Sequence, residues 1–144
     1  MIINTTAEGI SLARKLETES SSFYEGLAKK YPQGADVFLA FSKENKKNIA
    51  NIESTYYSVI TDAIEGCFAF NINSDDYTFD SQIPDNADYI DVIQRIIKIE
   101  DLIIKYYTIA SEQARSLMAD IPRVFLLIVK KRSSRKDTLE ALIT

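Results

Sequence analysis

Apolar residues recur at helical spacing along most of the chain, and breaks in this pattern separate four long segments. The spacing predicts helices at about residues 6–31, 35–65, 86–119 and 122–143. Thr5 and Glu8 have the spacing of a capping box at the start of the first helix, and Pro32 and Gly34 end that helix. Pro122 opens the fourth helix, in the turn where proline is favoured. The chain, residues 1–144, is therefore expected to be an all-α protein of a single domain.

Residues 66–85 lack helical spacing and contain turn signals rich in Asn, Asp and Pro. The other two links are short and imply antiparallel neighbours, whereas a link of about 20 residues can return along the bundle and make the second and third helices parallel. One long crossover between two helical hairpins is the connection of a ferritin-like four-helix bundle. The residues expected to hold the crossover against the helices, or to form a short edge hairpin instead, are Phe68, Phe70, Tyr77 and Phe79.

The two halves of the chain repeat one pattern. Glu17 lies seven residues before Tyr24, and Glu100 lies seven residues before Tyr107, so the second pair repeats the first at an offset of 83 residues. Such a repeat predicts two related helical hairpins. Residues seven apart share one side of a helix, so each Glu is expected to face the core together with its Tyr.

The second and fourth helices also carry polar residues on the side predicted to be buried. In the second helix the middle positions of an apolar seam are Asn45 and Asn48, and in the fourth they are Arg132 and Arg135. The sequence therefore predicts a polar cluster at one level of an apolar core. Its predicted members are Glu17, Tyr24, Asn45, Asn48, Glu100, Tyr107, Arg132 and Arg135.

This combination resembles the rubrerythrin-like branch of the ferritin-like superfamily, over nearly the whole chain. That family typically has Glu seven residues before Tyr on the first and third helices and an E-x-x-H motif on the second and fourth, which together bind a di-iron pair. Glu17 and Glu100 match the two single carboxylates. The E-x-x-H positions instead fall on residues 45–48, Asn-Lys-Lys-Asn, and 132–135, Arg-Ser-Ser-Arg. A shift of one residue places Glu44 in the first of these motifs but still supplies no His.

The residue types disfavour a normal di-iron centre. Iron in such sites needs anionic oxygen and imidazole ligands, but the chain contains no His, and a guanidinium group stays protonated and cannot ligate. No cofactor is therefore expected. The alternative is iron or manganese held by altered ligands, for which the candidates are Glu17, Glu44 and Glu100, with Asn48 as a further donor.

Two functions follow from these alternatives. The first is a non-catalytic structural or binding module in which Arg132 and Arg135 neutralise Glu17 and Glu100, since peroxidase or ferroxidase chemistry needs a redox metal. The second is a rubrerythrin-like metal-dependent oxidoreductase with altered ligands.

Charge and cysteine content narrow the range of partners and compartments. The net charge of −4 disfavours nucleic-acid binding, and in the basic run at 130–136 the residues that lie off the apolar seam are expected to form a solvated helix face. The longest uninterrupted apolar run, Val124 to Val129, is too short to span a membrane. Cys67 is the single cysteine, which excludes an internal disulfide and fits the reducing cytoplasm.

The apolar run and the isoleucine-rich third helix predict a homodimer through the outer faces of the helices at 86–119 and 122–143.

Overall fold

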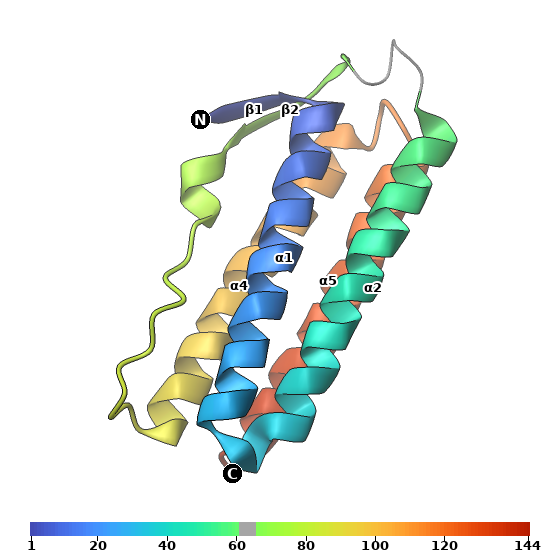
Figure 1. Ribbon diagram of the computed structural model, residues 1–144. Coiled ribbons are helices and arrows are strands. Elements are labelled where there is room, and N and C mark those ends of the chain that lie inside the picture. Colours follow the sequence, from blue (N-terminus) through green and yellow to red (C-terminus); the bar gives the residue numbers. More distant parts are fainter. Residues whose placement is uncertain (61–65) are drawn as a thin grey trace.

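Four long helices form two antiparallel hairpins that pack together, as Figure 1 shows for this computed structural model, which describes residues 1–60 and 66–144. Helices α1 (Thr6–Lys30) and α2 (Ala35–Val59) form the first hairpin, and α4 (Tyr89–Ala114) and α5 (Asp120–Ala141) form the second. Between the hairpins, α2 packs against α5 and α1 against α4. Helices α2 and α4 run in the same direction, because the crossover returns along the length of the bundle. The predicted architecture of two hairpins joined by a long crossover is confirmed.

Local chemistry explains where the first hairpin begins and turns. The Glu8 amide donates a hydrogen bond to Thr5 Oγ1 at 3.2 Å, and the Thr5 amide donates to Glu8 Oε1 at 2.9 Å, so the capping box is present. After Lys30, a short 3-10 turn, η1 (Pro32–Gly34), reverses the chain. The last described residue of α2 is Val59, and residues 61–65, which the sequence assigned to this helix, lie outside the described part of the chain.

The helices of the second hairpin have other bounds than the sequence predicts: α4 is shorter, and α5 ends at Ala141 rather than residue 143. Helix α4 begins at Tyr89 rather than residue 86 and ends at Ala114 rather than residue 119. Before it, residues 85 and 86 form a turn in which the Ala87 amide donates to the Pro84 carbonyl at 3.1 Å, and the Tyr31 hydroxyl, just after α1, donates to the Ala87 carbonyl at 3.1 Å. After Ala114 the chain continues as a turn at residues 115–117, in which the Leu117 amide donates to the Ala114 carbonyl at 3.0 Å. Helix α5 begins two residues before Pro122, which is still within its first turn.

A two-stranded antiparallel sheet, which the sequence did not predict, covers one end of the bundle. Strand β1 (Ile2–Thr5) pairs with β2 (Phe68–Asn73), so the crossover joins the N-terminal residues instead of forming a hairpin of its own. Phe70 is buried over Gly9 of α1, where an added Cβ atom would lie only 2.3 Å from the ring. Phe68 is 74% exposed, contrary to the prediction that it holds the crossover, because β2 turns this side chain outward.

The rest of the crossover follows α1 and α4. A second short 3-10 turn, η2 (Ser74–Tyr77), buries Tyr77 against Tyr106, with ring centroids 5.4 Å apart. Phe79 is partly buried and its ring meets that of Phe23 edge to face at 6.2 Å. Tyr77, Phe79 and Phe70 therefore hold the crossover as predicted.

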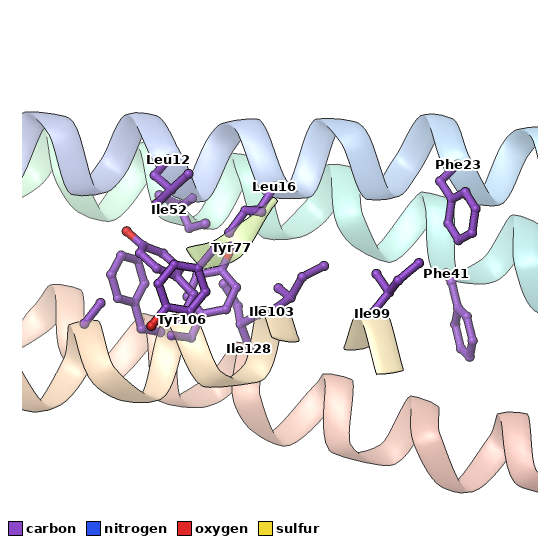
Figure 2. Packing of buried hydrophobic residues seen from close by; sticks show 14 of the residues in the cluster. Leu12, Leu16, Phe23, Phe41, Ile52, Tyr77, Ile99, Ile103, Tyr106 and Ile128 are labelled. Carbon is purple, nitrogen blue, oxygen red and sulfur yellow. The ribbon is translucent and has the colours of Figure 1, made fainter. Parts of the chain in front are cut away.

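Apolar side chains from all four helices fill the interior. Figure 2 shows Leu12, Ile52 and Tyr106 toward one end of this core, and Phe23 and Phe41 toward the other. Across the described residues, none of the helices combines the length and the apolar character needed to cross a membrane.

Candidate functional site

Eight polar side chains meet inside this apolar core, and each is no more than 2% exposed. They come from all four helices, and hydrogen bonds join them into one network, which we call the core polar cluster. Its members are Glu17, Tyr24, Asn45, Asn48, Glu100, Tyr107, Arg132 and Arg135. The structure thus brings together every residue that the helical spacing placed on the inward faces.

Arg132 of α5 lies at the centre of the cluster and bridges two carboxylates. Its Nη2 atom donates a hydrogen bond to Glu17 Oε2 at 2.6 Å, and its Nη1 atom donates to Glu100 Oε2 at 2.7 Å. All three side chains are completely buried. Because Glu17 belongs to α1 and Glu100 to α4, one guanidinium group links three helices through charge-assisted hydrogen bonds.

Arg135 extends the cluster to α2. Its Nη1 atom donates to Glu100 Oε1 at 3.2 Å, and its Nη2 atom donates to Asn45 Oδ1 at 2.6 Å. Its Nε atom donates to Glu44 Oε1 at 2.8 Å, at the edge of the cluster where the Glu44 side chain is 33% exposed. The guanidinium group also lies over the Phe41 ring, 4.9 Å from its centroid, in a cation–π contact.

The two tyrosines cross between the hairpins. The Tyr24 hydroxyl of α1 donates to Glu100 Oε1 of α4 at 2.5 Å, and the Tyr107 hydroxyl of α4 donates to Glu17 Oε1 of α1 at 2.9 Å. Each carboxylate therefore accepts one hydrogen bond from the tyrosine of the opposite hairpin and one from Arg132. The repeat seen in the sequence thus appears in the structure as a reciprocal exchange between α1 and α4.

The asparagines complete part of the network. Asn48 Nδ2 donates to Glu17 Oε1 at 3.3 Å, and Asn45 Nδ2 donates to the Ser20 hydroxyl at 3.0 Å. Ser20 was missed at the sequence level, although it follows Glu17 by three residues and so shares its helix face. Asn48 Oδ1 and Arg132 Nε are buried without a hydrogen-bond partner among the described residues, which reduces the net stability that the network provides.

Electrostatics favour the charged forms of Glu100 and Arg132. Burial raises the pKa of Glu100, but Arg132, Arg135 and the Tyr24 hydroxyl outweigh it, so the net pKa lies below its ordinary value. Burial lowers the pKa of Arg132, but Glu100 and Glu17 raise it well above the ordinary value. Burial, together with the nearby carboxylates, raises the pKa of both Tyr24 and Tyr107, which therefore act as neutral donors.

Acid should weaken the fold through Glu100. Because its pKa is lower in the folded than in the unfolded chain, the unfolded chain takes up a proton first as the pH falls below about 4.3. The stability that Glu100 provides is thus present above that pH and lost as the pH falls toward the folded pKa. In the wild type, the free energy of unfolding should therefore decrease as the pH is lowered. We expect this slope to be smaller in Glu100→Gln, by up to about 1.4 kcal/mol per pH unit.

Urea unfolding at a series of pH values measures this slope. Glu112→Gln, at an exposed position of the same helix, is the matched control and should leave the slope unchanged. Equal slopes for the wild type and Glu100→Gln would contradict the assignment.

The core polar cluster does not fit a di-iron pair or a single divalent ion. Glu17 and Glu100 already accept hydrogen bonds from Arg132, and Glu44 is bound to Arg135 at the edge. Residues 1–60 and 66–144 contain no group of three or more carboxylate, imidazole or thiol side chains placed to hold a metal ion. The two guanidinium groups occupy the centre of the cluster, where they would repel a cation.

Comparisons with protein-family models, curated proteins and solved structures find no match to this chain. What the described residues show is the fold: four long helices paired as two hairpins.

Proposed function

We propose that this chain is a non-catalytic ferritin-like module, structural or binding, in which Arg132 and Arg135 take the place of the two metal ions of a di-iron centre. The observation that carries the proposal is the Arg132 guanidinium group, fully buried between Glu17 and Glu100 at 2.6 and 2.7 Å. In the di-iron proteins of this architecture, metal ions lie between carboxylates contributed by different helices. Here a side chain of α5 supplies the positive charge in the same kind of position.

This substitution has a structural consequence. A carboxylate buried without a partner is very unfavourable, so Glu17 and Glu100 need cations in the core. Arginine supplies these cations permanently, whereas a metal ion must be acquired and can be lost. The cluster therefore joins the four helices in a way that depends neither on metal supply nor on redox state.

The oxidoreductase alternative predicts a different response to metal. An ion that binds the folded chain alone, at about 100 times its dissociation constant, adds about 2.7 kcal/mol to the unfolding free energy. We expect the unfolding midpoint to be the same in the presence of a chelator, Fe(II) or Mn(II), measured anaerobically by circular dichroism. A rise of the midpoint with stoichiometric iron or manganese would support a metal-dependent oxidoreductase and contradict the proposal.

We further propose that the module is a homodimer through the outer faces of α4 and α5. Leu126 and Leu127 are 51% and 55% exposed on α5, and Leu117 just after α4 is 54% exposed. Leu126 and Leu127 are neighbours in the chain, and exposed apolar side chains of this kind favour association. Light scattering at micromolar concentration should give the mass of two chains, and Leu127→Lys should give that of one. A monomer mass for the wild type would contradict the dimer but not the role of the core polar cluster.

A further inference from the structure

A cleft lies between α1 and residues 79–83 of the crossover. Figure 1 shows the crossover descending along the bundle from β2 to the start of α4. Its volume of about 600 Å³ falls within the range of small-molecule sites, roughly 300–1,000 Å³. Phe23 and Leu27 of α1 line one side, and Phe79 and Ile83 of the crossover line the other. The Phe23 and Phe79 rings meet edge to face at 6.2 Å; Phe23 is 6% exposed, so the partly buried Phe79 ring supplies most of the aromatic surface against which an apolar group can pack.

Gly26 in this cleft has no packing role within the chain. A glycine inside a helix is destabilising relative to alanine, and Gly9 of the same helix is accounted for by the Phe70 ring that lies on it. At Gly26, in contrast, an added Cβ atom would meet no other atom within 4 Å. The open space above Gly26 therefore belongs to the cleft, and a larger side chain there would fill it.

The charges at the cleft differ in how well they are paired. The Lys30 ammonium group is fully engaged, because it donates hydrogen bonds to the Ile83 and Pro84 carbonyls at 2.9 and 3.0 Å and to Asp85 at 3.3 Å. Glu19 has only a distant partner, Lys15 Nζ at 3.9 Å, and both side chains are largely exposed. Among the described residues that line the cleft, Glu19 supplies the one carboxylate.

Hydroxyl groups complete the rim. Thr18 and Ser22 precede Gly26 on the same face of α1, and Ser81 lies opposite on the crossover. A smaller hollow adjoins the cleft and shares Glu19 and Phe79 with it, which places this carboxylate and this ring where the two hollows meet. The cleft thus offers an aromatic surface, an uncommitted negative charge and hydroxyl groups.

We propose that this cleft binds a small organic ammonium compound, with its apolar ring system against Phe23 and Phe79 and its ammonium group at Glu19. Ring faces and a carboxylate both attract a cation, whereas the ammonium group of Lys30 is already bonded to two carbonyls and to Asp85. None of the core polar cluster residues lines the cleft, so this binding does not require the metal-site proposal to hold. Binding at this cleft would give the module a positively charged small-molecule ligand.

Tryptamine is a suitable probe, because the chain contains no Trp and the indole fluorescence of the ligand can be followed selectively. We expect saturable binding of tryptamine to the full chain below about 1 mM. Indole-3-propionate, which carries the same ring with a carboxylate, should bind at least tenfold more weakly. Absence of tryptamine binding, or equal binding of the two ligands, would overturn the proposal.

Two variants locate the site. Gly26→Leu should abolish tryptamine binding while leaving the fold intact by circular dichroism, since its side chain enters open space; Ala50→Leu, at an exposed position of α2, is the matched control. Glu19→Gln should weaken tryptamine binding at least tenfold, whereas Glu112→Gln, at an exposed position of α4, should not. Unchanged tryptamine affinity in folded Gly26→Leu or in Glu19→Gln would overturn the proposal.

Discussion

Replacing Arg132 with alanine is expected to lower the free energy of unfolding by about 3–5 kcal/mol. The guanidinium group binds Glu17 and Glu100 in a fully buried environment, so its removal leaves two carboxylates in the core with fewer partners. Arg123→Ala is the matched control, because Arg123 is 71% exposed and its ion pair with Asp120 spans 3.4 Å. An exposed pair of this kind contributes about 0–1 kcal/mol. Urea unfolding of the three proteins measures the difference.

A double variant separates charge pairing from simple loss of packing. Glu17→Gln combined with Arg132→Met removes one negative and one positive charge, and Glu100 keeps Arg135 at 3.2 Å and the Tyr24 hydroxyl as partners. We expect the double variant to be much less destabilised than the sum of its two single variants, because neither charge is left alone. Additive effects, or a loss below about 1 kcal/mol for Arg132→Ala, would contradict a buried charge network.

Introducing metal ligands at four positions of the core polar cluster is expected to create a metal-dependent fold. The variant carries Asn45→Glu and Asn48→His on α2, and Arg132→Glu and Arg135→His on α5. With Glu17 and Glu100, these changes give the set found in di-iron bundles: a Glu from each of two helices and a Glu-x-x-His motif from each of the other two. Four carboxylates then balance two divalent cations, as two carboxylates balance two guanidinium groups in the wild type.

Without metal, this quadruple variant should be largely unfolded, because four carboxylates would be buried together with no cation. Addition of Fe(II) or Co(II) should restore the helical circular dichroism, since metal binding and folding are coupled when ligands meet only in the folded state. The proposal that residues 45, 48, 132 and 135 correspond to the ligand positions of a di-iron bundle would be contradicted by either of two results. One is a quadruple variant that is fully folded in the presence of a chelator, and the other is a variant that metal fails to refold.

Helical spacing was sufficient to place the core polar cluster. A residue seven positions from another returns to the same helix face, so Glu17 and Tyr24 had to share a side of α1. Arg132 and Arg135 lay between apolar residues of a seam, and burial of that seam required both to be buried. The pairing of Arg132 and Arg135 with Glu17 and Glu100 followed from charge, because a buried guanidinium group needs a carboxylate.

Features that depend on contacts distant in the sequence could not be predicted in this way. Strand β1 is four residues long, and its pairing with β2 joins Ile3 to Ile72. The hydrogen bond from the Tyr31 hydroxyl to the Ala87 carbonyl, just before α4, joins segments that the sequence alone does not bring together. The bond from Arg135 to Glu44 depends on the depth at which α5 packs against α2, which periodicity does not specify.

The central claim is that arginine side chains stand where metal ions would otherwise be held. The most direct test is the metal content of the wild type and of the quadruple variant. Each protein is loaded with Co(II) anaerobically and desalted, and its cobalt content is measured by elemental mass spectrometry. We predict less than about 0.1 ion per chain in the wild type and about two in the variant. Stoichiometric cobalt in the wild type, or none in the variant, would contradict the claim.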